Sequence, residues 1–258
     1  MDETPREPVM VWQLLRRHFV RIVIGSVLAV VVYGLLTVWM PYQREQRIAK
    51  KFEELGGVVE FEYAGPTWIP KSMRDRTTLF SRVTVVNLYN TQITDAGLEH
   101  LKGLTKLTYL RIHATKVTDA GMEHLKGMTN LTLLNLASTH VTDAGLENLK
   151  GLANLQLLDL DDTQVTDAGL EHLKGLTSIT TLFLKRTQVT NAGLEHLKGL
   201  ANLQLLDLDD TQVTDAGLEY LKGLTNLVDL SLHTTKTTAD GRAMFRKELP
   251  NCDIYPNP

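Results

Sequence analysis

A unit of 24 residues, repeated along most of the chain, constrains the fold more than any other feature of the sequence. Its full form reads T-x-V-T-D-A-G-L-E-H-L-K-G-L-T-N-L-x-x-L-x-L-x-x. Successive units begin at Thr91, Thr115, Thr139, Thr163, Thr187, Thr211 and Thr235, and the last of them is degenerate. One unit of this kind cannot bury its own apolar side chains. The units are therefore expected to stack into a solenoid with a continuous core.

The last part of each unit predicts a strand. Apolar residues alternate there with polar ones, which is the period of a strand, as at Leu107, Leu110 and Ile112. A partial unit before Thr91 fills the same positions with Val83, Val86 and Leu88. Every unit should therefore contribute one strand to the same sheet.

The middle of each unit predicts a short helix. Asp119 stands where an N-cap is expected, because its carboxylate can accept backbone hydrogen bonds. Glu123 and Lys126 are three residues apart and are predicted to pair on the outer face. Gly127 is suited to the left-handed backbone at a helix end. Gly121 is small enough to let the helices of adjacent units approach closely.

This repeat resembles the leucine-rich repeat, in the class L-x-x-L-x-L-x-x-[C/N/T]-x-V-T-D-x-G-L. The resemblance covers residues 83 to 256, with Thr where the class usually has Asn or Cys after the strand. It implies an α/β fold, a curved solenoid with parallel strands on the concave face and helices on the convex face. Positions that vary between the units predict a function in protein binding without catalysis.

The layout of the whole chain is similar to that of bacterial leucine-rich repeat proteins anchored by a single membrane span. The resemblance rests on a basic N-terminal tail before an apolar segment, on AKKFEELGG from Ala49, on VVEFEYAGPTW from Val58 and on LPNCDI from Leu249. It implies a chain tethered to a bacterial membrane.

An uncharged segment of nineteen residues, 22–40, predicts a transmembrane signal-anchor. As a helix it would rise ~28 Å, about the thickness of the hydrocarbon core. A cleaved signal peptide and a buried helix of a soluble protein are the alternatives. The layout expected is a tail over 1–21, the span over 22–40, a juxtamembrane helix and N-terminal cap over 41–82, repeats over 83–234, and a degenerate repeat with a C-terminal cap over 235–258.

The flanking charges bear on the orientation of the span. Four Lys or Arg residues lie on each side of it, so the positive-inside count is balanced. Arg16, Arg17 and Arg21 directly precede the span and favour a cytoplasmic N-terminus. Together with the bacterial resemblance, this predicts a single-pass inner-membrane protein with its repeats on the periplasmic side.

Exposed leucines at either end of a solenoid need covering. A polar helix over 42–55 and a strand containing Val59, Phe61 and Tyr63 are predicted to cover the first end, together with Trp68. Phe245, Leu249, Cys252 and Ile254 are predicted to close the other end. Cys252 is the single cysteine, so no intramolecular disulfide forms, and we interpret it as a buried apolar side chain.

Residues that vary between units mark the candidate site, because the repeated positions maintain the fold. They fall in columns along the predicted concave face, where strands lie ~4.8 Å apart. The candidate partner-binding residues are Tyr89, Tyr109, Arg111, His113, Asp159, Asp161, Phe183, Lys185, Arg186, Asp207 and Asp209. In the alternative interpretation, Lys185 and Arg186 form a structural ladder that neutralises the flanking aspartates.

The sequence offers little for other functions. It contains no nucleophile elbow, phosphate-binding loop, H-E-x-x-H or C-x-x-C motif, so we predict no enzyme, no cofactor and no catalytic residue. The net charge is −3 and no basic stripe is present, which argues against nucleic-acid binding. A column of histidines at 100, 124, 172 and 196 is interpreted as a solvated face, and a calcium site among the aspartates lacks further oxygen ligands, so no metal is predicted. The alternative to ligand binding is a structural spacer in the cell envelope.

Overall fold

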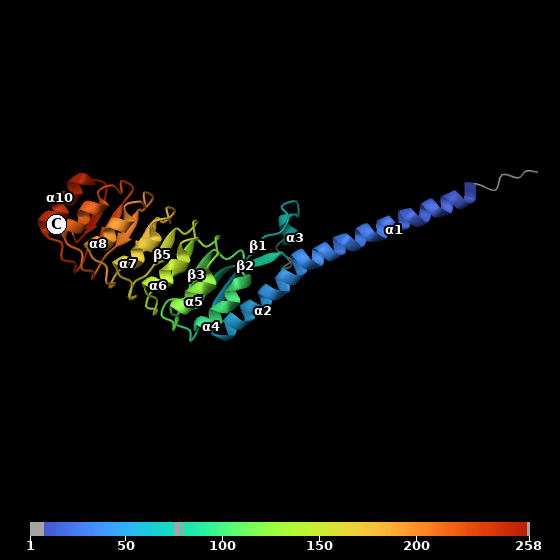
Figure 1. Ribbon diagram of the computed structural model, residues 1–258, viewed down its shortest axis with the longest axis horizontal. Helices are drawn as coiled ribbons and strands as arrows, with labels where there is room; N and C mark the ends of the chain where they lie inside the picture. Colours follow the sequence, from blue (N-terminus) through green and yellow to red (C-terminus); the bar gives the residue numbers. More distant parts are fainter. Residues whose placement is uncertain (1–7, 75–77, 79, 257–258) are drawn as a thin grey trace, which may run out of the picture. The chain divides into compact units, whose positions relative to one another are not determined.

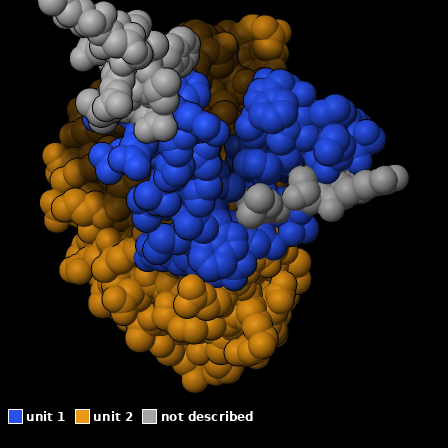
Figure 2. All heavy atoms as spheres, turned by 90° about the vertical axis from the view of Figure 1, so that its right-hand side faces the viewer, with its two compact units in different colours: residues 1–44, 63–81 blue, residues 45–62, 82–258 orange. Residues whose placement is uncertain are grey.

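The computed structural model describes residues 8–74, 78 and 80–256 and divides into two compact units (Figure 2). One unit comprises residues 1–44 and 63–81, and the other comprises residues 45–62 and 82–258. In the first unit, helix α1 (Pro8–Gly34) continues through a π-helical turn (Leu35–Trp39) into α2 (Met40–Glu54), which runs on into the second unit. A short helix, α3 (Lys71–Arg74), also belongs to the first unit.

Over the residues that the structure describes, the second unit is built on one sheet of nine strands that follow one another in chain order. The strands from β2 to β9 pair in parallel. They are β1 (Val58–Tyr63), β2 (Ser81–Asn87), β3 (Tyr109–Arg111), β4 (Leu133–Asn135), β5 (Leu157–Asp159), β6 (Thr181–Phe183), β7 (Leu205–Asp207), β8 (Asp229–Ser231) and β9 (Asp253–Tyr255). This arrangement confirms the predicted solenoid of parallel strands.

Short helices lie on the side of the solenoid opposite the strands (Figure 1). They are α4 (Asp95–Leu98), α5 (Asp119–Met122), α6 (Asp143–Leu146), α7 (Asp167–Leu170), α8 (Asn191–Leu194) and α9 (Asp215–Leu218), with α10 (Ala239–Glu248) at the end. Each of α4 to α9 is one α-helical turn continued by a 3-10 turn, such as Glu123–Leu125 after α5. The helix predicted in each unit is therefore present, but it is much shorter than the helices of a helix bundle.

The repeated leucines form the core between these two layers. In the central unit, Leu158, Leu160 and Val165 have no exposed surface. The threonine that opens each of the six full units is buried too, whereas Thr235 is half-buried. Thr163 satisfies its hydroxyl by donating to the Leu160 carbonyl at 2.6 Å. Thr thus bonds the turn backbone where the repeat class usually has Asn or Cys, so the buried hydroxyl is not left unpaired.

The residue before each of these threonines adopts a left-handed backbone. The positions are Asn90, Ala114, Ser138, Asp162, Arg186, Asp210 and Thr234, with φ between 54° and 57°. Such a conformation costs an L-residue about 1–2 kcal/mol. Because alanine, arginine and threonine share it with asparagine and aspartate, the turn geometry comes from the stacked units and not from the side chain at this position.

Asp119 does not cap its own helix, so that prediction was wrong. Thr118 is the N-cap and accepts a hydrogen bond from the Ala120 amide at 3.3 Å. The Asp119 carboxylate instead accepts from the amide and hydroxyl of Thr142 in the next unit, at 2.8 and 2.6 Å. Gly121 lies close to the equivalent Asp95, as the expected close approach requires.

This aspartate–threonine ladder links consecutive units along the solenoid. Its pairs are Asp95–Thr118, Asp119–Thr142, Asp143–Thr166, Asp167–Thr190, Asn191–Thr214 and Asp215–Thr238. It joins the helical layer of one unit to that of the next, in addition to the backbone bonds of the sheet.

The first end of the core is covered mainly by α2. Phe52 is fully buried there, Val59 and Phe61 pack against the same core, and the Glu45 carboxylate accepts from the Val83 amide at 2.8 Å. Trp68 is 80% exposed, so its predicted place over the first leucines was wrong. Its segment, 63–81, belongs to the other compact unit, which the alternation of strand residues could not reveal.

The opposite end is closed as predicted, by Phe245, Leu249, Cys252 and Ile254, which are at most 7% exposed. Burial raises the pKa of Cys252 to about 11, so its thiol stays protonated at neutral pH. Cys252 is therefore an apolar packing residue and a poor nucleophile.

The N-terminal helix is long and apolar enough to cross a membrane. Its apolar window has a mean hydropathy of 2.4, and the window is 0% buried inside the protein. Ile22, Leu28 and Val30 are between 60% and 70% exposed. A core helix of a soluble protein would instead be mostly covered.

Candidate functional site

The candidate residues lie on the strand face, and the sheet register brings their columns together. Arg111 on β3 is two strands away from Asp159 on β5, with Asn135 between them. Phe183 follows on β6 beside Asp159, and Asp207 follows on β7. The parallel register thus makes one continuous row from residues 24 positions apart in the sequence.

The N-terminal part of this face presents aromatic and basic side chains. Tyr89 and Tyr109 are 55% and 44% exposed, and Arg111 is exposed beside them. The His113 ring stacks on Tyr89 with a centroid distance of 4.2 Å and an angle of 19°. Burial lowers the pKa of His113, so the ring is neutral at pH 7. The Tyr89–His113 stack is therefore an uncharged aromatic surface on the strand face.

The central part of the face is acidic, and its carboxylates bond the surrounding backbone. Asp159 accepts from the Asn135 amide side chain at 2.7 Å and from the Asp161 amide at 3.1 Å. Asp161 in turn accepts from the backbone amide of Lys185 at 2.7 Å. Each carboxylate therefore fixes the turn at the end of a strand, a structural role that the sequence columns did not reveal.

The second acidic pair repeats this pattern two units later. Asp207 accepts from the Asp209 amide at 2.9 Å. Asp209 accepts from the Ser231 hydroxyl at 2.6 Å and from the His233 amide at 2.7 Å. Ser231 and His233 belong to this network although they were not among the candidate residues.

The two basic residues of the centre differ in their contacts. Arg186 forms an ion pair with Asp162, and this guanidinium holds the pKa of Asp162 below its usual range. Lys185 contacts Asp161 through its backbone amide, and its charge only partly offsets the burial that raises the pKa of Asp207. Part of the predicted ladder is therefore present in the Arg186–Asp162 pair. Arg186 is exposed, whereas Phe183 and Lys185 are half-buried.

Burial also raises the pKa of the central aspartates. The pKa of Asp161 rises to about 7, through burial first and through the charge of Asp159 second. Burial raises the pKa of Asp159 and of Asp207 in the same direction. The acidic centre thus gains negative charge as the pH rises towards neutrality.

Replacing Asp161 with asparagine is expected to flatten the dependence of stability on pH. Between about pH 4 and pH 7 the folded state holds a proton on Asp161 that the unfolded chain has released. The proton on Asp161 therefore stabilises the folded state fully below about pH 4. This contribution to the free energy of unfolding is lost as the pH rises through about 7. The variant keeps an oxygen acceptor for the Lys185 amide, so its thermal midpoint should exceed that of the wild type at about pH 8 and match it below about pH 4. Identical pH profiles for the two proteins would contradict the assignment.

The histidine column lies on the helical layer, as expected. His100, His124 and His196 are half-buried, and Asn148 and Tyr220 interrupt the column. Over residues 8–74, 78 and 80–256, no group of three His, Cys, Asp or Glu side chains is placed to hold a metal ion.

Comparison with known proteins bears on this arrangement of strands, turns and buried leucines. Residues 105–165 match a family model described as Leucine rich repeat, and residues 199–222 match a second model of the same description. The chain is a leucine-rich repeat protein. The leucine-rich repeat generally serves as a protein-interaction module, and the resemblance drawn from the repeat pattern is confirmed.

Among solved structures, this leucine-rich repeat protein is similar to internalin C2 from Listeria monocytogenes. The sequence identity is 29% and the TM-score 0.54, over 67% of this chain and 70% of that one. An internalin (inlF) of the same organism is 22% identical with a TM-score of 0.55, over 71% of this chain and 52% of that one, which shows the fold alone. No curated protein matches the chain in sequence.

Proposed function

We propose that this leucine-rich repeat protein is a membrane-tethered interaction module that binds a protein ligand on its concave face without catalysis. The observation that carries the proposal is the pair of half-exposed tyrosines, Tyr89 and Tyr109, beside the exposed Arg111. Tyr and Arg are enriched among residues that dominate binding energy. The repeated leucines are buried, so these exposed aromatics do not serve the core.

The surface around these residues supports binding and not only packing. Aromatic side chains at 89, 109 and 183 are spread over several units of the strand face, and the acidic centre adjoins them. A partner with apolar or aromatic side chains, an acidic group opposite Arg111 and basic groups opposite the acidic centre would complement this face, because like charges repel. The variable residues on the strand face would therefore determine which partner binds. The repeated residues would maintain the stability of the fold.

The membrane tether is supported by the exposed apolar helix. Its apolar window is not buried within the protein, and about 25 cal/mol per Å² would be gained by removing such a surface from water. The three arginines at 16, 17 and 21 favour a cytoplasmic N-terminus, and hence repeats on the periplasmic side of a bacterial inner membrane.

In a bacterial host, alkaline phosphatase fused after the last repeat should be active, whereas the same enzyme fused at the N-terminus should not. The opposite pattern would reverse the proposed orientation.

The binding proposal is tested by photo-crosslinking from the strand face. A benzophenone amino acid at Tyr109 should give a discrete crosslinked product in membranes that saturates, and the same group at Glu147 on the helical layer should not. Arg111→Glu should reduce the yield about fivefold or more, the size expected for a hot-spot residue. The matched control Lys116→Glu reverses a charge at the start of the next unit, outside strand β3, and it should leave the yield unchanged.

The outcomes separate binding from a purely structural role. Both charge variants should keep the thermal midpoint of the wild type, because both side chains are exposed. If no product saturates from Tyr109, or if Arg111→Glu and Lys116→Glu act alike, the strand face is not a binding site. The spacer function would then be the better account of the chain.

A further inference from the structure

One groove between two units differs from the same place elsewhere in the solenoid. In four later units the lysine after the 3-10 turn has ψ between −27° and −33°, at Lys150, Lys174, Lys198 and Lys222. Lys126 instead has ψ 123°, and Gly127 has φ +86°. Among the described turn glycines of the repeats, at 127, 151, 175, 199 and 223, positive φ occurs at Gly127 alone. The peptide group between Lys126 and Gly127 is therefore turned relative to its counterparts.

The next residue differs in the same unit. The later units have a fully buried leucine there, at positions 152, 176, 200 and 224. Met128 replaces it and is only half-buried. A cavity of about 350 Å³ opens between this turn and the preceding one, with Leu101, Leu104 and Leu107 among its walls. This volume is at the lower end of the range for small-molecule pockets.

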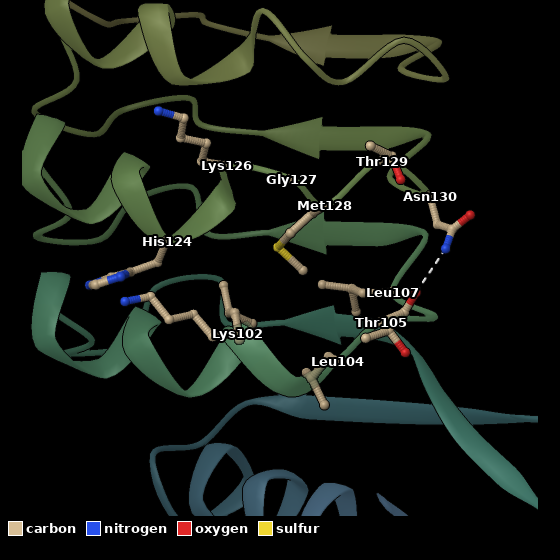
Figure 3. A pocket seen from close by; sticks show the side chains of 11 residues that line it. Lys102, Leu104, Thr105, Leu107, His124, Lys126, Gly127, Met128, Thr129 and Asn130 are labelled. Atoms are coloured by element: carbon tan, nitrogen blue, oxygen red, sulfur yellow. Dashed lines mark hydrogen bonds between the residues drawn. The ribbon is translucent and has the colours of Figure 1, made fainter. Parts of the chain in front are cut away.

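The groove has a cationic end. Lys102 and Lys126 lie at one end of it, with the His124 ring beside Lys102 and the Lys126 side chain extending away from them. Met128 lies in the middle, and Asn130 bonds the Thr105 carbonyl at 2.7 Å at the other end (Figure 3). The cavity lining contains no Asp or Glu side chain. A second groove on the helical layer has Asp215, Glu219, Asp240 and Glu248 in its lining, so an uncompensated cationic end is not general to this face.

The lysines of this groove also lack the partners that later units provide. Four later lysines pair with the glutamate three residues before them, at 2.8 to 3.5 Å. Over the part of the chain that the structure describes, neither Lys102 nor Lys126 forms an ion pair, so the predicted Glu123–Lys126 pair was wrong. Both ammonium groups are therefore available to an external anion.

We propose that this groove binds a small carboxylate with a short apolar body. The carboxylate would lie between Lys102 and Lys126, and the apolar body would lie on Met128 and Leu104. Two cations at one end of an apolar slot complement such a molecule in charge and in polarity. The site is on the opposite layer from the strand face, so it does not depend on the binding function proposed above.

The probe for this site is 3-phenylpropionate, with 3-phenylpropylamine as the same body carrying the opposite charge. The full chain in lipid nanodiscs, labelled with ¹³C-methyl methionine, reports on the groove through Met128, whose resonance is assigned by its loss in Met128→Leu. The carboxylate should shift the Met128 resonance in a saturable manner through the ring current. The amine and inorganic phosphate should leave it in place.

Charge variants identify the site. Lys102→Glu combined with Lys126→Glu should weaken 3-phenylpropionate binding at least about tenfold, the loss expected for charge-assisted bonds. Lys150→Glu combined with Lys174→Glu makes the same changes two units later, and it should leave binding unchanged. The single variant Lys126→Gln should weaken binding less than the double variant and in the same direction.

Several results would overturn this assignment. Equal shifts with the amine would show an apolar slot without charge selection, and equal effects of phosphate would show no role for the apolar body. A shift that does not saturate, or an equal loss in the control variant, would remove the site altogether. The crosslinking from Tyr109 is a separate measurement, so failure here leaves the strand-face proposal standing.

Discussion

Replacing Gly145 with alanine is expected to lower the free energy of unfolding by about 2–3 kcal/mol. A Cβ atom at this position would lie 2.5 Å from Asp119 Oδ1 and 2.9 Å from Val141 Cγ1. The carboxylate cannot move away freely, because it holds the amide and hydroxyl of Thr142 at 2.8 and 2.6 Å. The added methyl group would therefore displace both hydrogen bonds or push the two units apart.

The control for this variant is Gly151→Ala in the same unit. Gly151 has no atom within 4 Å of an added Cβ and does not have a positive φ. Alanine there should leave the stability unchanged or raise it by about 0.4–1 kcal/mol, since it restricts the unfolded chain. Urea unfolding followed by circular dichroism gives both values, and hydrogen exchange should localise the loss for Gly145→Ala to the neighbouring units. Equal stabilities for the two variants would refute the close-packing argument.

The regular part of the fold could be predicted because every repeat places apolar residues that must be buried at the same positions. Leu158 and Leu160 belong to a pattern that recurs every 24 residues, so strand, core and parallel register follow from one unit. The C-terminal cap could also be predicted, because Phe245 and Ile254 are apolar residues in the last, degenerate unit. The prediction for Trp68 was wrong because a large aromatic residue near the cap was expected to be buried, and Trp68 is exposed.

The local geometry of each unit was harder to predict from the sequence, because two neighbouring residues are both suited to the N-cap position. Thr118 and Asp119 are both good N-cap residues, and only the next unit decides between them by offering Thr142 to the aspartate. The turned peptide at Lys126 has no signature in the sequence, since K-G follows the helix in the other full units as well. The substitutions of Met122 and Met128 for leucine were the visible signs in the leucine positions that this unit differs.

The sequence predicted which candidate residues lie on the strand face. It did not predict the hydrogen bonds and ion pairs that they form. The positions of Tyr109 and Arg111 on the strand face follow from alternation in the strand alone. The sequence could not show that Asp161 bonds the next turn or that Arg186 is held by Asp162, because both contacts depend on the left-handed turn residues. Those turn residues are chemically mixed and carry no common sequence signal.

Replacing Asp143 with alanine is expected to destabilise the solenoid by about 1–3 kcal/mol. Asp143 accepts from the Thr166 amide at 2.8 Å and from the Thr166 hydroxyl at 2.7 Å. Alanine leaves both half-buried donors without an acceptor, and an unmade bond to such a group costs more than the bond itself contributes. Because the ladder joins neighbouring units, the loss should appear in hydrogen exchange on both sides of the Asp143–Thr166 contact.

The chain itself supplies the matched variant, since Asn191 takes the place of aspartate in one rung. Asn191 accepts from the Thr214 amide at 2.9 Å and donates to the Thr214 hydroxyl at 2.9 Å, so asparagine completes the same pair of contacts. Asp143→Asn is therefore expected to stay within about 0.5 kcal/mol of the wild type in urea unfolding, while Asp143→Ala does not. If asparagine were as damaging as alanine, the negative charge would be the stabilising feature and not the geometry of two hydrogen bonds. If alanine were harmless, the stacked leucines and the sheet alone would hold adjacent units together.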